Sequence, residues 1–267
     1  MSRAISTVAD VVVCLLLVSA AVFVVTTPAE PPADLPADDT AQVLATSTAA
    51  VEYEFGTGNA TRTHRTRGTY AGLLGRAALL DATYGGEPVA PGSEGFVTGV
   101  RERTRSVLGA NVQVSVRWAP YPGTPVAGRV SVGPDPPPAA DLHVARLTVP
   151  VGVPPSDPSR TYRTVANGVA DVVTRGLLPE ETAGLPLGTG PYRRAVDHRL
   201  GVLAGDRHRA ARAYAARGNA TAARQVAARA LAGVFARDLR SRFDSPRAAA
   251  RAVRAGMATV VVRRWAG

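Results

Sequence analysis

Histidine, acidic and serine side chains could supply catalysis or bind a metal, but their spacing here forms no recognisable site. His198 and His208 are ten residues apart, which at about 100° per residue places them on different faces of a continuous helix. Gly92-Ser93-Glu94-Gly95 lacks the spacing of a nucleophile elbow, and no glycine-rich phosphate loop leads into a helix with a lysine. We therefore expect no enzyme, no metal site and no cofactor.

Two asparagines are candidate modification sites, because Asn59 and Asn219 each begin an N-x-T sequon. Such a sequon accepts a glycan when it is exposed outside the cell. Asn59 lies in a polar stretch, whereas Asn219 follows Gly218 and could instead cap a helix. Trp118 and Tyr121 could form a platform for a sugar, or cover the core beside a strand end.

Arginine supplies all the basic charge, since the 31 Lys+Arg residues include no lysine and the net charge is +10. The segment from Arg193 to the end contains 17 arginines and only four aspartates. The basic charge of the chain therefore belongs to this segment. A GC-rich coding bias could also produce it. We expect a solvated helical surface that binds acidic polymers weakly and loses affinity as salt rises. The candidate polyanion-binding residues are Arg209, Arg212, Arg224 and Arg229.

The elements that would position these residues begin with an apolar run from Ile5 to Val25, whose only charge is Asp10. At about 1.5 Å per residue, its roughly 21 residues would reach about 31 Å, enough to span a bilayer core. Arg3 precedes the run and acidic residues follow it. The positive-inside rule then predicts a single-pass protein of the cell membrane, with a cytoplasmic N-terminus and an extracellular body. A cleaved signal peptide is the alternative.

The residues before the run form a second processing signal. In Arg3-Ala4-Ile5-Ser6, a basic residue, a small residue and an apolar residue follow one another. This pattern resembles the class III signal of archaeal pilin-like proteins, which a prepilin peptidase cuts between Ala4 and Ile5. The resemblance implies that the helix is retained after processing.

Residues 3–10 and the apolar run resemble the start of uncharacterised haloarchaeal pilin-like membrane proteins. The segments 118–122 and 133–138 also resemble such a family. The resemblance implies that the N-terminal helix packs with pilin-like partner subunits. It also implies that Asp10 aids assembly by pairing with a neighbouring N-terminal amine. Asp10 would be the sixth residue after cleavage, one place later than the acid of bacterial pilins, and an interfacial residue is the alternative.

The rest of the chain predicts an α+β outer domain with a small antiparallel sheet and a helical C-terminal segment. Strands are expected in the latter half of 43–55 and at 112–118, 128–132 and 142–149, the last three forming a meander. Helices are expected at 70–84 and 93–108, from Ser159 to before Gly176, at 193–217 and 220–242, and from Ser245 toward Arg264. Candidate core residues of the C-terminal helices are Leu200, Leu203, Tyr214, Val226, Leu231, Val234, Phe235 and Leu239.

These elements divide the chain into a cytoplasmic tip and transmembrane helix (1–27), a linker rich in proline and acids (28–39), an α+β domain (40–192) and a basic helical segment (193–267). The function predicted from them is a membrane-anchored, pilin-like protein of the cell envelope with a structural or assembly role. Its partners would be membrane lipid and pilin-like subunits. The alternative is a membrane-anchored module that binds acidic polymers, such as surface glycan or extracellular nucleic acid.

Overall fold

The computed structural model describes residues 37–57, 60–90, 93–152, 161–177, 198, 201–217 and 219–266. They belong to one compact unit, residues 36–267. The predictions that lie outside the described residues are the apolar run 5–25, the processing residues Ala4 and Ile5, the assembly residue Asp10, the sequon residue Asn59 and the core candidate Leu200.

A six-stranded antiparallel sheet forms the centre of this unit, in the order β4-β3-β6-β5-β8-β7. Valines at alternate positions of its long strands point to one face and are fully buried, among them Val114, Val116, Val130, Val260 and Val262, as expected for a sheet with one face against a core. The strands are β3 (Thr83–Tyr84), β4 (Glu87–Pro88), β5 (Val112–Trp118), β6 (Val126–Val132), β7 (Leu142–Pro150) and β8 (Met257–Trp265).

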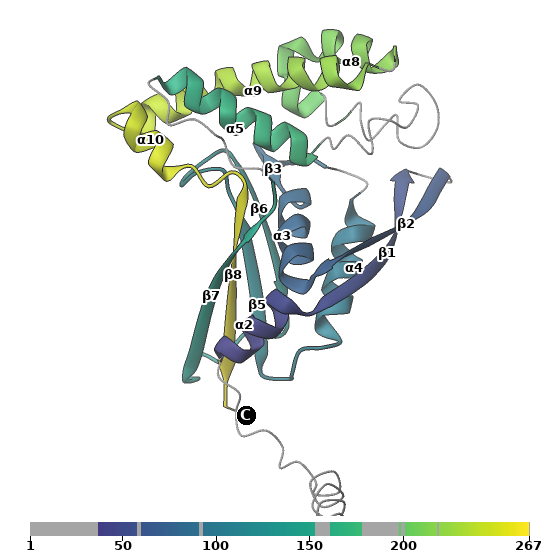
Figure 1. The fold of residues 1–267 in the computed structure, drawn as a ribbon, viewed down its shortest axis with the longest axis vertical. Helices are drawn as coiled ribbons and strands as arrows, with labels where there is room; N and C mark the ends of the chain where they lie inside the picture. Colours follow the sequence, from purple (N-terminus) through teal and green to yellow (C-terminus); the bar gives the residue numbers. More distant parts are fainter. Residues whose placement is uncertain are drawn as a thin grey trace, which may run out of the picture. The chain divides into compact units, whose positions relative to one another are not determined.

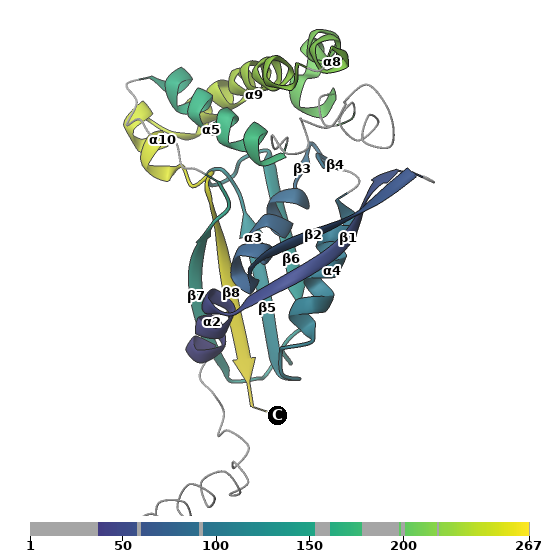
Figure 2. The same ribbon diagram turned by 45° about the vertical axis from the view of Figure 1, so that its right-hand side comes forward.

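Three helices cover that apolar face: α2 (Ala37–Thr46), α3 (Tyr70–Leu80) and α4 (Glu94–Arg105) (Figures 1 and 2). Central helix α3 buries Leu74, Ala77 and Ala78 completely. It approaches the sheet so closely that a Cβ atom on Gly128 of β6 would lie 1.9 Å from the Ala78 carbonyl oxygen. Small residues on both elements therefore set the distance between helix and sheet.

A long two-stranded ribbon, β1 (Thr48–Thr57) and β2 (Ala60–Thr69), packs on α4. Tyr53 of β1 meets Phe96 of α4 edge to face, with ring centroids 5.0 Å apart. A Cβ atom on Gly95 or Gly99 of α4 would lie 2.8 Å from the Glu54 carbonyl oxygen or from Val51 Cγ1, respectively. The two glycines, four residues apart on one helix face, allow the helix to rest directly on the strand.

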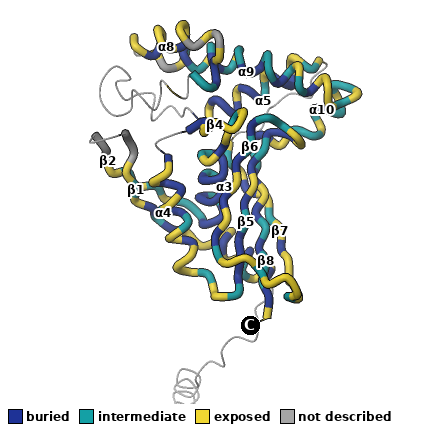
Figure 3. Tube along the Cα trace, turned by 180° about the vertical axis from the view of Figure 1, so that it is seen from behind, coloured by how far each residue is buried: buried dark blue, intermediate teal, exposed yellow. Residues whose placement is uncertain are grey.

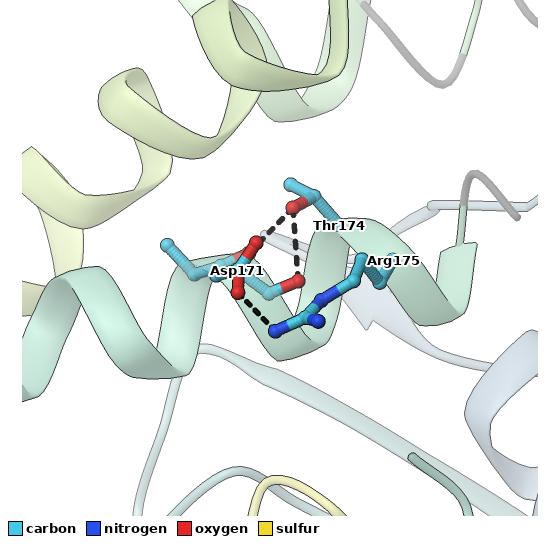
Figure 4. Close-up of polar contacts among 4 residues, drawn as sticks. Asp171, Thr174 and Arg175 are labelled. Carbon is cyan, nitrogen blue, oxygen red and sulfur yellow. Dashed lines mark hydrogen bonds and ion pairs between the residues drawn. The ribbon is translucent and has the colours of Figure 1, made fainter. Parts of the chain in front are cut away.

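The remaining helices pack together in a layer next to α3 and the loops at one end of the long strands (Figure 1). Helix α5 lies along α9 and buries its valine stripe there. Its buried Thr174 hydroxyl donates to the Ala170 carbonyl oxygen at 2.7 Å, while the neighbouring Asp171 carboxylate pairs with Arg175 (Figure 4). The elements are α5 (Tyr162–Leu177), the 3₁₀ turn η1 (Gly205–Arg207), α8 (His208–Ala216), α9 (Ala220–Arg242) and α10 (Pro246–Ala252).

Side-chain caps position two of these helices at the starts that the sequence predicts. The Asn219 side chain accepts a hydrogen bond from the Ala222 N–H at 3.0 Å at the start of α9. Ser245 accepts one from Ala248 at 3.2 Å at the start of α10, where Pro246 occupies the first turn. Both interactions satisfy N–H groups that a helix leaves without an internal partner.

The predicted architecture is wrong in its C-terminal part, and the described residues do not contain the predicted transmembrane helix. None of the helices in the described ranges is long and apolar enough to cross a membrane. The helix expected from Ser245 toward Arg264 ends at Ala252, and residues 257–265 form strand β8. The reason is the two-residue period of Ala258, Val260 and Val262, which buries one face of a strand and would spread around a helix.

Strand β8 also breaks the predicted meander, because it lies between β5 and β7 and pairs with both. Among the predicted core residues, Leu203, Leu231, Phe235 and Leu239 are buried, whereas Tyr214 is 37% exposed with the Arg217 guanidinium over its ring. Val226 and Val234 are half-buried. At the other end of the unit, the acids Asp38 and Asp39, placed in the linker by the sequence, lie in the first turn of α2.

Candidate functional site

The sheet face opposite α2, α3 and α4 bears a groove with a volume of about 920 Å³. Its floor consists of the side chains that alternate with the buried valines, and Figure 3 shows buried and exposed residues alternating along these strands. The groove runs from Asp135 and Gln113 at one end to Tyr121 and Arg254 at the other. Its lining includes four arginines, two serines and two threonines.

The strand register arranges these side chains in three rows across the sheet. Successive rows are two residues apart, which is about 6.7 Å along a strand. The first row holds Arg129, Arg117, Thr259 and Thr148; the second holds Ser131, Ser115, Val261 and Arg146; the third holds Gln113, Arg263 and Val144.

Two like charges stand directly opposite each other in the first row, because Arg117 of β5 pairs with Arg129 of β6. Both side chains are exposed. The Trp265 N–H donates to the Asn111 carbonyl oxygen at 3.2 Å, and in this register the backbone groups of Arg117 point to β8 and away from β6. The pair is thus of the non-hydrogen-bonded kind, in which opposed Cα atoms are about 4.5 Å apart and side chains are close. Like charges in this arrangement destabilise a sheet.

No carboxylate in the described part of the chain lies within 4.0 Å of the Arg117 or Arg129 guanidinium group. Asp81, near the backbone of Arg129, has its ion pair with Arg101 instead, at 4.0 Å. Burial raises the pKa of Asp81, and the Arg101 charge and the Arg129 N–H oppose that shift. The like-charged pair therefore faces the groove without a compensating acid from these residues.

A third arginine is held in place by neutral groups. Arg263 of β8 donates through Nη1 to the Gln113 Oε1 atom at 2.9 Å and to the Ser115 Oγ atom at 3.0 Å. Gln113 is 5% exposed and donates through Nε2 to the Asp135 carboxylate at 2.5 Å. Because its acceptors are uncharged, the network fixes the Arg263 guanidinium and leaves its positive charge available.

Arg254 lies at the other end of the groove, between α10 and β8. Its Nη1 atom donates to the carbonyl oxygens of Arg251 at 2.7 Å and Val253 at 2.8 Å. Its backbone N–H donates to the Pro120 carbonyl oxygen at 2.7 Å. Backbone acceptors therefore hold this guanidinium beside the loop that follows β5.

Tyr121 closes the same end, with 1% of its surface exposed and its ring edge-on to Phe235 at a centroid distance of 5.7 Å. Its hydroxyl has no hydrogen-bond partner among the described groups, and burial raises its pKa. The tyrosine therefore anchors the groove to α9 and presents no free aromatic face to a ligand.

This arrangement can bind anions, since arginines suit the geometry of carboxylate and phosphate or sulfate groups. No cluster of three or more histidine, cysteine, aspartate or glutamate side chains that could hold a metal occurs in the described ranges. The histidines lie apart: His64 stacks on Tyr53, His143 lies on β7, and a ring nitrogen of His198 is 3.1 Å from the Pro88 carbonyl oxygen.

The predicted polyanion-binding arginines lie elsewhere, on the helical layer. Arg209 and Arg212 are exposed on α8, while α9 carries exposed Arg229 and half-buried Arg224. None of the four lines the groove. The sugar platform suggested by Trp118 is ruled out, because its indole is fully buried and donates to the Ala255 carbonyl oxygen at 2.8 Å.

Sequence reasoning missed the groove arginines. The alternation of residues 112–118 was recognised, and it places Gln113, Ser115 and Arg117 together on the polar face. Nothing in the sequence signals that Arg129 pairs opposite Arg117, or that residues 257–263 supply the neighbouring strand.

Residues 9–265 match the model of a protein family described as a family of unknown function (DUF7284). No curated protein and no solved structure matches the chain.

Proposed function

The chain belongs to the DUF7284 family, and because the function of that family is unknown, we propose from the geometry that this protein binds an extended acidic polymer along the arginine-lined groove of its sheet. The observation that carries the proposal is the Arg117–Arg129 pair. Two like charges opposite each other on a sheet cost stability. An anionic group between them would turn this cost into a favourable interaction on binding.

The positions of the other arginines favour a polymer over a single small anion. Arg263 lies two rows from Arg117, about 13 Å along the strands. Arg254 marks the opposite end, beyond the Arg117 row. One carboxylate or sulfate group cannot reach both ends, whereas a chain with repeated charges can contact all of these side chains together.

The pilin-like assembly role depends on residues 3–10, outside the described residues, so it stays a prediction. It expects a mature chain that begins at Ile5, which N-terminal sequencing of the native protein would show. Binding by the α8 and α9 arginines also stays a prediction. It competes directly with the groove, and the same experiment separates the two surfaces.

The test compares matched double variants of the full chain, kept in a non-ionic detergent, for binding to fluorescent heparin. Arg117→Gln with Arg129→Gln should weaken binding about tenfold or more at low salt, because two charge-assisted contacts are lost. The slope of log affinity against log salt should become shallower by about 0.7–0.9 for each lost charge contact. Unfolding should show unchanged or slightly higher stability, since the variant removes a like-charge pair.

The control variant is Arg209→Gln with Arg229→Gln, which removes the same charge from exposed positions on α8 and α9. It should keep most of the affinity. If the control variant loses binding and the groove variant keeps it, the helical surface is the binding site. If the native protein does not bind heparin at low salt, the proposed function is wrong.

A further inference from the structure

We propose, on the basis of the proposed function, that the polymer bound in the groove is an acidic polysaccharide and not a nucleic acid. Three features of the groove lead to this choice: its hydroxyl groups, the exclusion of aromatic faces, and the way its charges are spaced between neutral groups.

Each strand of the groove carries one hydroxyl side chain and one arginine on the same face. Ser131 lies opposite Ser115 in the second row, and Thr148 lies opposite Thr259 in the first, beside Arg117. Of these four, Ser131, Thr148 and Thr259 are exposed. A hydroxyl group both donates and accepts hydrogen bonds, and the hydroxyl groups of a sugar ring do the same. A chain that carries hydroxyls between its charges therefore matches this surface.

Single-stranded nucleic acids bind largely by stacking bases on aromatic side chains. Among the described residues that line the groove, Tyr121 is the one aromatic; it is 1% exposed and held edge-on by Phe235 and Phe243. The described lining thus offers no aromatic face on which a base can stack. For the same reason it offers no stacking platform to a neutral sugar, so the charges must anchor the polysaccharide and the hydroxyls must provide its selectivity.

The test measures the affinity of the full-length protein for two fluorescent probes of equal charge at one low salt concentration. One probe is an oligogalacturonate and the other is oligo-dT. We expect the oligogalacturonate to bind about tenfold more tightly. Thr148→Val with Thr259→Val should lower that affinity about fivefold, as expected for the loss of one or two hydrogen bonds, and should leave oligo-dT binding within about twofold.

Valine keeps the shape and the strand propensity of threonine, so this variant should fold. Thr63→Val, on an exposed position of β2 far along the chain from the groove strands, is the matched control and should change neither affinity.

Three outcomes would overturn the polysaccharide assignment: equal affinity for both probes, tighter binding of oligo-dT, or an equal loss of affinity for both probes in the Thr148→Val, Thr259→Val variant. If both probes bind equally and Arg117→Gln with Arg129→Gln abolishes both, the proposed function survives and only the polysaccharide assignment fails. If the protein binds neither the oligogalacturonate nor oligo-dT, both proposals are wrong.

Discussion

The buried hydroxyl of Tyr121 gives a test at the scale of a single residue. It lies near Thr124 and the Asp238 carboxylate, but no hydrogen bond of ordinary geometry joins it to either. A buried polar group without a partner costs free energy. We therefore expect Tyr121→Phe to raise the free energy of unfolding by about 1 kcal/mol in urea denaturation. A loss of that size would show that the hydroxyl has a partner in solution.

The same side chain predicts how stability depends on pH. Burial is the main cause that raises the Tyr121 pKa in the folded protein, whereas an unfolded tyrosine ionises near pH 10. Above that pH the unfolded state therefore holds fewer protons than the folded state, and stability falls as pH rises. The free energy of unfolding should drop more steeply above about pH 10 in the native protein than in Tyr121→Phe. Parallel curves for the two proteins would contradict this.

Residue-level prediction succeeds where a side chain depends on its neighbours in sequence. Asn219 was identified as a cap and Ser245-Pro246 as a helix start, because both signals involve residues within one turn of the helix. The Arg117–Arg129 pair was missed because its register depends on how the loop between β5 and β6 closes. Counting arginines by segment pointed instead to α8 and α9.

At the scale of elements, the contact between α4 and β1 depends on the absence of side chains. A Cβ atom at Gly99 would lie 2.8 Å from Val51 Cγ1 and 3.4 Å from the Glu52 carbonyl oxygen. Gly99→Ala should therefore lower the free energy of unfolding by about 1–3 kcal/mol, because the strand must move away, although alanine is the better helix former.

Gly233 on α9 is the matched control, because a Cβ atom there would meet nothing closer than an Arg237 Nη1 atom at 4.0 Å. Gly233→Ala should leave the packing intact and raise stability by up to about 1 kcal/mol through helix propensity alone. Thermal unfolding of the two variants should give shifts of opposite sign. An increase in both would show that α4 does not rest on β1 as described.

The helices were predictable because their apolar residues recur at helical spacing, and the predicted ranges at 70–84, 93–108 and 220–242 overlap α3, α4 and α9. Strand β8 was not. It follows a long run of alanine and arginine that favours helix. Residues 257–265 form a strand because they pair with both β5 and β7, which lie far away in the sequence. Such long-range pairing leaves little trace in the local sequence.

At the scale of the whole molecule, β8 should be indispensable, because it hydrogen-bonds to β5 and β7 and carries the fully buried Val260 and Val262. A chain that ends at Gly256 should not fold, since its sheet would lose a central strand and leave two unpaired edges. Circular dichroism and urea denaturation should show no cooperative transition. A chain that ends at Trp265 should unfold like the native protein, and cooperative folding of the shorter chain would contradict this topology.

Chemical footprinting of the arginines tests most directly whether the groove is the binding surface. Phenylglyoxal modifies accessible arginines, and mass spectrometry can compare the extent at each position with and without a saturating acidic polysaccharide at low salt. Bound polymer should reduce modification at Arg117, Arg129 and Arg254, which line the groove, and leave Arg209 and Arg229 on α8 and α9 unchanged. Equal modification of the groove arginines in both samples, with protection confined to α8 and α9, would contradict the proposed function.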